Sequence, residues 1–309
     1  MIVQVVDQVR GPGIGASMAA ACLGVSPYLS PIGAFLQLTG RATSTSNRFS
    51  RWGQILEPII RGDYAARHRY DRPREVEIFV PASSLYHPEY PWLRATPDGI
   101  VREWITTFTA ADGTEVGYFD RHLVQVKCVD ARIAWHWGLG KVKSAPAHYR
   151  IQAVVEMAVT GLPRNDFAVL CGGNDDWEVI VERDLDLESA VIARLAQFWD
   201  ALQRDEPPAI DESEDWRAYF ADRLPKEKAP MVADHNAEAW IEEWKRARET
   251  REQAERDEET AKNHLLAIAV AGNATSINSD HGPILVVRSS NKPPYLKAPS
   301  SWAIDKDVQ

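Results

Sequence analysis

Apolar side chains recur at helical spacing in three stretches of the first 70 residues. Residues 14–24 are small and apolar, and Gly24 is expected to end a short helix there. A second helix is expected at about 31–39. Between 50 and 66, apolar residues return every three or four positions, which predicts a third helix with one buried face. Pro58 is expected to bend or divide this helix, because proline lacks a backbone donor.

The pattern then changes to an alternation typical of strands, beginning with Val76, Ile78 and Val80. Ala-Asp-Gly-Thr at 111–114 predicts a hairpin turn. Between residues 76 and 203 the expected elements are strands at 76–80, 94–101 and 122–129, a helix at 146–160, strands at 166–171 and 177–182, and a helix at 186–203. This order predicts an α/β fold with a central mixed β-sheet flanked by helices, and not a regular dinucleotide-binding alternation.

Pro207-Pro208 suggests a boundary between an N-terminal domain at 1–206 and a C-terminal extension at 207–309. The extension is expected to form a C-terminal helical arm. Its predicted elements are one long charged helix at 234–271 ended by Gly272, a last strand at 284–288, and an irregular tail from Pro293-Pro294 onward.

Composition describes an ordinary globular protein, with 45% hydrophobic and 26% charged residues. No apolar run approaches the roughly 20 residues that a membrane span needs, and the first ten residues lack the layout of a signal peptide. Cys22, Cys128 and Cys171 form no CxxC pair, which disfavours a zinc site, an iron–sulfur cluster or a disulfide framework. We therefore expect the reducing cytoplasm of a bacterial host cell and no membrane partner.

The net charge of −9 would by itself argue against nucleic-acid binding, because phosphate contacts need lysine and arginine. The charges are unevenly distributed, however. Residues 1–70 hold 7 Lys and Arg against 3 Asp and Glu, and residues 121–164 hold 7 against 2. Residues 205–262 hold 10 against 18. The acidity is thus concentrated in a late segment, and two earlier stretches are basic enough to contact DNA, although ordinary fluctuation of charge explains them as well.

One set of polar residues indicates chemistry. Asp98 stands in Ala-Thr-Pro-Asp-Gly, which is expected to break the strand at 94–101, so that its carboxylate would project from the sheet. In the strand at 122–129, a period of two places Gln125 and Lys127 on the same face. Taken alone, such a pair describes a solvated strand face. Together with Asp98 it resembles the PD-(D/E)xK nuclease signature, in which acidic side chains hold Mg²⁺ and a lysine acts on the attacking water.

The surrounding motifs make the resemblance more specific. In order along the chain they are Arg10-x-x-x-Ile14-Gly15-x-Ser17, Leu23-Gly24-x-Ser26-Pro27-Tyr28, Arg51-Trp52-Gly53-x-x-Leu56-Glu57-Pro58, Ala95-Thr96-Pro97-Asp98-Gly99, Val126-Lys127 and Tyr149-x-x-Gln152. Over about residues 10–205 the chain resembles the YqaJ-type viral recombinase and phage lambda exonuclease family. The resemblance implies a restriction-endonuclease-like core and cleavage of the DNA backbone.

The resemblance also implies roles for individual residues. Asp98, Gln125 and the backbone carbonyl of Val126 would bind Mg²⁺, for which Mn²⁺ could substitute, and Glu57 would make an outer or second-metal contact. Lys127 would position or polarise the attacking water. Gln152 would border the same site.

The remaining residues implied by the resemblance belong to a pocket for a 5′-phosphate or to the DNA path: Arg10, Ser17, Thr96, Arg132 and Tyr149. An arginine offers a forked donor to phosphate, and a helix N-terminus offers free amides. Ser17 could instead cap its helix, and Tyr149 could serve packing alone.

Two positions depart from the family pattern. Gln125 stands where the family normally has Glu, and Met18 stands where relatives often have Asp. An amide matches a carboxylate in size but brings only a carbonyl dipole to Mg²⁺, so metal affinity and rate should fall. An introduced substitution, a natural glutamine, and conversion to a DNA binder that does not cut are three explanations that the sequence leaves open.

Two functions therefore compete. The first is a Mg²⁺-dependent exonuclease that digests linear double-stranded DNA from a 5′ end and feeds single strands to a phage annealing protein, assembled as a homo-oligomer such as a trimeric ring. The second is a catalytically silent protein that binds DNA ends. A further possibility concerns the extension, where Trp240 and Trp244 could serve a partner or self-association, or simply pack on the chain's own domain.

Overall fold

The computed structural model describes residues 13–43, 48–70, 76–138, 142–221, 223–227, 230–289 and 292–299. The chain divides into two compact units, Met1–Arg223 and Leu224–Gln309. None of the helices described is both long and apolar enough to cross a membrane.

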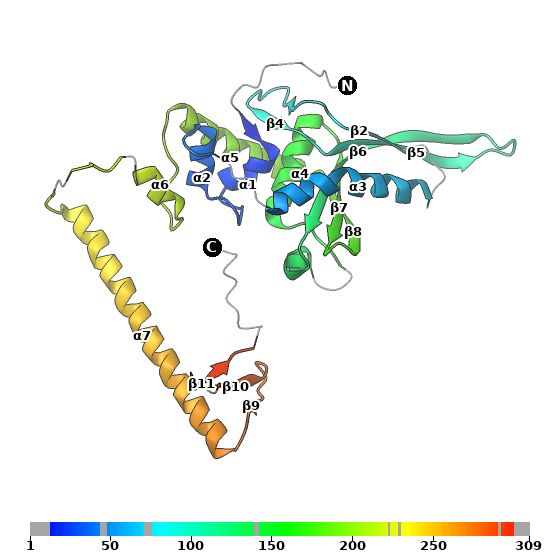
Figure 1. The fold of residues 1–309 in the computed structure, drawn as a ribbon. Helices are drawn as coiled ribbons and strands as arrows, with labels where there is room; N and C mark the ends of the chain where they lie inside the picture. Colours follow the sequence, from blue (N-terminus) through cyan, green and yellow to red (C-terminus); the bar gives the residue numbers. More distant parts are fainter. Residues whose placement is uncertain are drawn as a thin grey trace. The chain divides into compact units, whose positions relative to one another are not determined.

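The first unit is built on a five-stranded mixed sheet (Figure 1). Its strands, in spatial order, are β2 (Val76–Phe79), β5 (Gly99–Thr109), β6 (Glu115–Val129), β7 (Arg164–Cys171) and β8 (Asp175–Glu182). Only the β6–β7 pair is parallel, and helix α4 (Ala147–Thr160) makes the crossover between these two strands. The prediction of an α/β fold with a central mixed sheet flanked by helices is confirmed.

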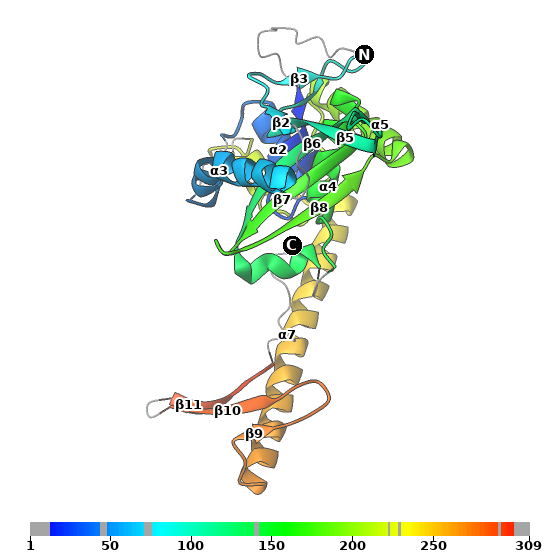
Figure 2. The same cartoon turned by 90° about the vertical axis from the view of Figure 1, so that its right-hand side faces the viewer.

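The two faces of this sheet are covered by different helices (Figure 2). On one face, Ile60 and Tyr64 of α3 (Arg48–Tyr70) pack against Val124 and Val126 of β6. On the other face, α4 and the 3₁₀ helix η1 (Ala131–Trp137) cover the remaining side chains of β6 and β7. Because side chains alternate along a strand, Gln125 and Lys127 face α4 and not α3.

A second layer packs beside the sheet. Its elements are the small sheet β1 (Ile14–Gly15), β4 (Leu93–Ala95) and β3 (Leu85–Tyr86), and helices α1 (Ala16–Cys22), α2 (Pro31–Leu38), α5 (Leu185–Gln203) and α6 (Asp215–Ala221). Helix α1 ends just before Gly24, which turns the chain with φ +70°. Ser30 caps α2 by accepting from the amide of Gly33 at 3.0 Å.

The first unit continues past the expected boundary at Pro207-Pro208. Trp216 of α6 is buried with Phe35 of α2, and Ser30 donates to Asp215 at 2.6 Å. This helix was not expected from the sequence, and its packing places the boundary between the units at Arg223.

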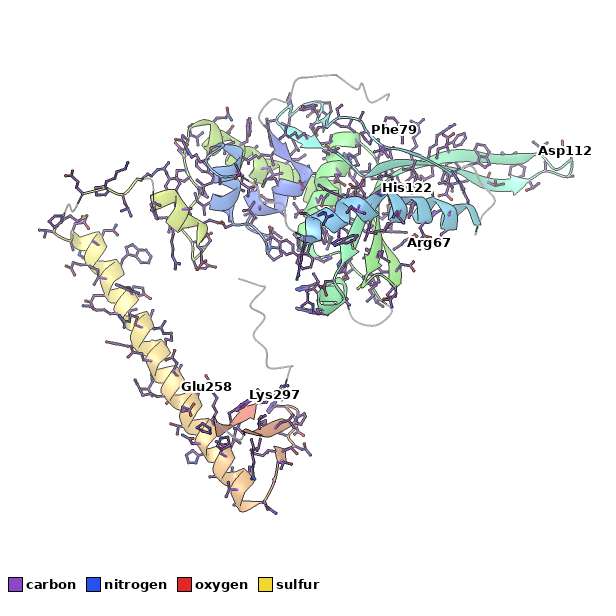
Figure 3. All side chains as sticks on the ribbon, in the orientation of Figure 1. Arg67, Phe79, Asp112, His122, Glu258 and Lys297 are labelled. Carbon is purple, nitrogen blue, oxygen red and sulfur yellow. The ribbon has the colours of Figure 1, made fainter. Side chains whose placement is uncertain are left out.

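Strands β5 and β6 form a long hairpin that extends beyond the rest of the sheet, with Asp112 at its tip (Figure 3). In the described ranges, the pairing of β5 with β2 extends along β5 as far as Glu103. The pairing of β6 with β7 begins at Leu123 of β6. The expected turn at 111–114 lies at this tip. Gly117 is required in the hairpin, because a Cβ there would meet the backbone oxygen of Ile105.

The second unit contains the long helix α7 (His235–Ala271) and a sheet of β9 (Ser276–Ile277), β10 (Ile284–Ser289) and β11 (Lys292–Lys297). Asp234 caps α7 by accepting from the amide of Ala237 at 2.8 Å. The predictions of a helix at 234–271 and a strand at 284–288 are confirmed.

Two sequence-based expectations were wrong. The tail is not irregular at Pro293-Pro294, because both prolines lie in β11, which is an edge strand where a missing amide donor is tolerated. Of the two alternatives for Pro58, division of the helix is wrong, since α3 runs through this exposed position without a break, and a bend stays a prediction.

Candidate active site

Asp98 lies in the three-residue passage between β4 and β5, next to β6. Its Oδ2 accepts hydrogen bonds from the Gln125 side-chain amide and from the backbone amide of Val126, both at 2.7 Å. Burial raises the pKa of the Asp98 carboxyl to about 6, and the charge of Lys127 opposes this rise. The predicted convergence of positions 98, 125 and 127 at one place is therefore present in the structure.

Gln125 is buried, with 4% of its surface exposed. Its amide nitrogen donates to Asp98, while its Oε1 is buried without a hydrogen-bond partner. Such an atom is costly to bury and needs an explanation. An unpartnered oxygen beside a buried carboxylate is suited to receive a cation or a donor from a bound molecule.

Val126 contributes through its backbone. The ladder between β5 and β6 ends at the pair Gly99–Val124, so the Val126 amide is free to bond the Asp98 side chain. The N–H and C=O of one residue point the same way in a strand. The carbonyl of Val126 is therefore directed toward the side on which Asp98 lies.

Lys127 follows on the same face of β6. Its Nζ donates to Oε1 of Gln152 at 3.1 Å and lies 4.6 Å from the ring centroid of Tyr149. Burial lowers the pKa of the Lys127 ammonium, and the carboxylates of Asp98, Glu156 and Glu57 oppose this shift. Gln152 and Tyr149, which the sequence placed at the same site, thus both contact Lys127.

Glu156 is a residue of this site that sequence reasoning missed. It is 1% exposed on α4, and its two carboxylate oxygens accept from Gln152 at 2.9 Å and from Asn165 at 2.7 Å. Burial raises its pKa to about 7. The signal available in the sequence was its position four residues after Gln152, on the same helix face.

Glu57 lies on α3 and reaches the site through Arg61. The Arg61 Nη1 donates to Glu57 at 2.8 Å and to the backbone oxygen of Asp98 at 2.9 Å. The charge of Glu57 also raises the pKa of Asp98. Glu57 is thus near the centre but separated from Asp98 by a bridging guanidinium.

The predicted phosphate-pocket residues have other partners in the structure. Thr96 is hydrogen-bonded to Ser84 at 2.9 Å, and Arg132 is paired with Asp130 at 2.7 Å. No hydrogen bond or ion pair in the described ranges joins Ser17, Thr96 and Arg132 to one another. Arg10 lies outside the described residues.

Ser17 is exposed in the first turn of α1. The alternative that Ser17 caps this helix is wrong, because the cap residue is Gly15 and no side chain bonds there. Ser17 therefore has an exposed hydroxyl beside the free amides of a helix start, but α1 has only 7 residues.

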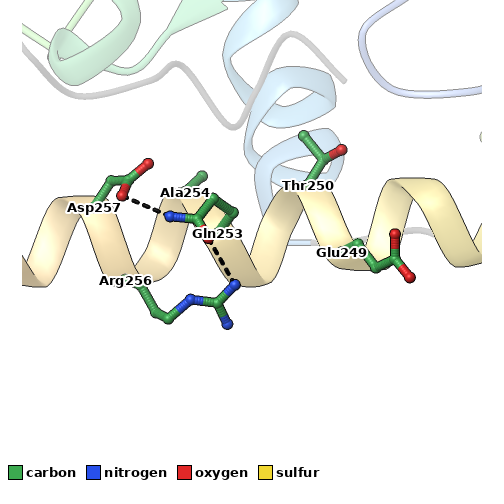
Figure 4. A pocket seen from close by; sticks show the side chains of 6 residues that line it. All are labelled: Glu249, Thr250, Gln253, Ala254, Arg256 and Asp257. Atoms are coloured by element: carbon green, nitrogen blue, oxygen red, sulfur yellow. Dashed lines mark hydrogen bonds between the residues drawn. The ribbon is translucent and has the colours of Figure 1, made fainter.

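A hollow in the second unit has no bearing on this site (Figure 4). The side chains that line it come from neighbouring turns of α7 and are all exposed. Gln253 donates to Asp257 and accepts from Arg256, each at 2.8 Å. The hollow is a gap between solvated side chains of one helix.

A divalent cation such as Mg²⁺ needs oxygen ligands, and the site offers several. No group of three or more His, Cys, Asp or Glu side chains in the described ranges could hold a metal ion. Mg²⁺ nevertheless often uses only one or two protein carboxylates and completes its shell with water and substrate oxygens. Asp98, the unpartnered oxygen of Gln125 and the Val126 carbonyl together offer such a partial shell, so the residues fit a weakly held hard cation.

Comparisons with known proteins support a family assignment. The chain is 25% identical over 233 residues to the uncharacterized protein YqaJ of Bacillus subtilis (strain 168), a match that covers 74% of this chain and 65% of that protein. The chain thus spans less than two thirds of the length of this relative.

Solved structures show partial likeness. An alkaline exonuclease of Laribacter hongkongensis has a TM-score of 0.42 at 20% identity, over 69% of this chain and 92% of that one. A phage related exonuclease of Haemophilus somnus 129PT has a TM-score of 0.41 at 13% identity, over 62% and 96%. The sequence also matches the family described as the YqaJ-like viral recombinase domain over residues 7–163. On this match, which spans half of its length, the chain belongs to the YqaJ-like viral recombinase domain family.

Proposed function

We propose that this chain is a Mg²⁺-dependent deoxyribonuclease that degrades linear double-stranded DNA from its ends in the 5′-to-3′ direction. The observation that supports the proposal is the convergence of Asp98, Gln125 and Lys127 around one partly buried point on the α4 face of the sheet. Family membership supports a role in homologous recombination, with a phage single-strand annealing protein as partner and a homo-oligomer, such as a trimeric ring, as the active assembly.

The metal would be held by Asp98, by Oε1 of Gln125 and by the Val126 carbonyl, with Glu57 as an outer contact. When bound, Mg²⁺ neutralises the phosphate and acidifies a bound water. Lys127 holds an ammonium at the same point, where it orients the attacking water and adds positive charge next to the developing phosphorane charge. Gln152 accepts from Lys127 and limits where Nζ can move.

Gln125 is expected to make the enzyme slow. Its amide nitrogen donates to Asp98, and only its neutral oxygen is left for a cation, so the metal would gain a dipole where a carboxylate supplies a full charge. A glutamate would remove the hydrogen bond and add a full negative charge to the metal shell. The hydrogen bond between Gln125 and Asp98, which joins two of the proposed metal-binding side chains to each other, also favours a second candidate function, a DNA-end-binding protein.

The test is incubation of a 5′-phosphorylated linear duplex with Mg²⁺, comparing the protein that has Gln125 with its Gln125→Glu variant. The proposal expects Gln125→Glu to be faster by about 10–100-fold, the usual effect of a change at a metal site. Loss of label from the 5′ end first would establish direction. A duplex left intact by both proteins, but retarded by both in a gel, would replace the enzyme with the binding protein.

A further inference from the structure

Glu156 carries the most completely buried carboxylate near the candidate site, and nothing in the proposed chemistry uses it directly. It is 1% exposed, and its nearest polar contacts are the amide groups of Gln152 and Asn165. A buried carboxylate that forms no ion pair is expensive to maintain. Its two neighbours therefore indicate what it contributes.

Both carboxylate oxygens of Glu156 are acceptors in this arrangement, whereas a side-chain amide can present either its oxygen or its nitrogen. Glu156 Oε1 accepts from Gln152 at 2.9 Å, so the nitrogen of this amide must face Glu156. The oxygen of Gln152 then faces the other way, toward Nζ of Lys127 at 3.1 Å. If the amide turned around, two donors would meet at Lys127 and two acceptors would meet at Glu156.

We propose that Glu156 is a positioning residue of the nuclease centre: it fixes the orientation of the Gln152 amide, and Gln152 thereby holds the ammonium of Lys127 in place. The inference rests on the proposed function. Glu156 forms no hydrogen bond with Asp98 or Gln125, and its hydrogen bond to Gln152 connects it with Lys127. Its charge also acts on Lys127 directly, so orientation and charge must be tested separately.

Asn165 makes it possible to test the orientation of the Gln152 amide separately from the charge of Glu156. Its nitrogen donates to Glu156 Oε2 at 2.7 Å, while its buried Oδ1 has no hydrogen-bond partner. In a Glu156→Gln variant, the new amide can present its oxygen to Gln152 and its nitrogen to Asn165, provided that the Asn165 amide turns to offer Oδ1. This variant therefore keeps the orientation and removes the charge. Glu156→Leu removes both.

The kinetic experiment uses the full chain in the Gln125→Glu background. We expect Glu156→Leu to lower kcat by about 10–100-fold with little change in KM, as for loss of an outer-shell partner. Glu156→Gln is expected to retain about the parent rate. The matched control is Glu188→Leu, because Glu188 is also buried but is bonded to Arg183 away from the site. Circular dichroism and thermal melting verify folding of each variant.

A second readout does not depend on catalysis. The side-chain amide resonances of Gln152, assigned by their absence in Gln152→Leu, should be shifted and protected from exchange in the parent and in Glu156→Gln. They should lose both features in Glu156→Leu. If the background enzyme cuts nothing but the resonances behave in this way, the proposed function fails and the orientation of Gln152 by Glu156 stands.

Two results would overturn the inference. One is a folded Glu156→Leu variant with the parent kcat or with unchanged Gln152 resonances. The other is a folded Glu156→Gln variant that loses as much kcat as Glu156→Leu, since the site would then need the charge of Glu156 and not the orientation that it imposes.

Discussion

On the α3 face of the central sheet, buried charges meet their partners directly, whereas on the α4 face amide groups stand between them. Arg164 faces Asp166 at 2.9 Å on the first face, and Tyr64 donates to the same carboxylate at 2.9 Å. On the second face, Lys127 bonds the oxygen of Gln152, and only the nitrogen of Gln152 reaches Glu156. Both sets of residues extend from the same two strands, β6 and β7, or from the helices that cover them.

This difference has a physical consequence. A cation in contact with an anion has its field largely cancelled, which suits a structural role. An amide spacer satisfies hydrogen bonds without neutralising charge, so Lys127 retains a field that a phosphate could meet. His122, fully buried on the α3 face, even has its pKa lowered to about 4 by burial and by Arg164, and is therefore neutral at physiological pH. We infer that the part of the α4 face around Lys127 is arranged for chemistry and the part of the α3 face around Asp166 for stability.

The largest expected effect is the loss of nuclease activity in Lys127→Met. Removing the ammonium should lower kcat by about 10²–10³-fold, as for other groups that stabilise developing charge. The free energy of unfolding should change by less than about 1 kcal/mol, because the loss of a hydrogen bond is offset by removal of a buried charge. Activity is measured in the Gln125→Glu background and stability by urea unfolding. A variant that cuts at the parent rate would refute the assignment of chemistry to this face.

Arg164→Met is the counterpart on the α3 face. It leaves Asp166, whose side chain is 2% exposed, without its cation, and should lower the free energy of unfolding by about 3–5 kcal/mol at pH 8. Burial already raises the pKa of Asp166 to about 6 with Arg164 present, so the pKa should rise further in the variant. The folded variant then binds a proton more tightly than the unfolded chain, and the deficit should shrink as pH falls to 5. Urea unfolding at both pH values checks this, and the surviving folded fraction should retain its activity.

The sequence predicted the order of the main elements because their patterns are local. The alternation at 122–129 placed Gln125 and Lys127 on one face, and Gly272 correctly marked the end of the long helix. The convergence of Asp98 with these two residues followed from family resemblance. Gln125 donates to Asp98, and the charge of Lys127 opposes the rise in the Asp98 pKa.

What could not be predicted depends on partners distant in the chain. Helix α6 forms where Trp216 packs on α2, and β11 forms as an edge strand despite two prolines. Glu156 looks like an ordinary helix residue until β7 brings Asn165 against it. Single-residue patterns do not specify such long-range neighbours, and the same limit applies to Thr96, whose partner is Ser84. Arg132 is a different case, because it pairs with Asp130 only two residues away.

A smaller effect is expected from Tyr64→Phe, which tests whether the α3 face around Asp166 contributes to stability and not to the reaction. The hydroxyl donates to Asp166 and lies 3.0 Å from Nε2 of His122, so its removal takes one hydrogen-bond partner from each of two buried side chains and leaves them with Arg164. The free energy of unfolding should fall by about 1–2 kcal/mol. Tyr118→Phe on the hairpin is the control, since Tyr118 is 56% exposed and should be neutral. A loss in kcat at unchanged stability would show that the α3 face also takes part in the reaction.

The smallest predicted effect on stability among the variants that change it has the opposite sign. Asp98→Asn should abolish cutting and yet raise the free energy of unfolding at pH 8 by about 1 kcal/mol, because it removes a buried charge that no ion pair compensates. Burial raises the Asp98 pKa to about 6, so the folded parent binds a proton more tightly than the unfolded chain and becomes less stable as pH rises from about 4 to about 6.

The amide variant lacks this dependence, so its advantage should be full above pH 6 and absent near pH 4. Urea unfolding at several pH values measures the difference, with Asp200→Asn at an exposed position as the control. If Asp98→Asn instead destabilised the protein at pH 8, as Arg164→Met is expected to, the two faces would not differ in the way that their hydrogen bonds indicate. The carboxylate at 98 would then be a structural anchor, and the stability cost expected of a catalytic site would be absent from the α4 face.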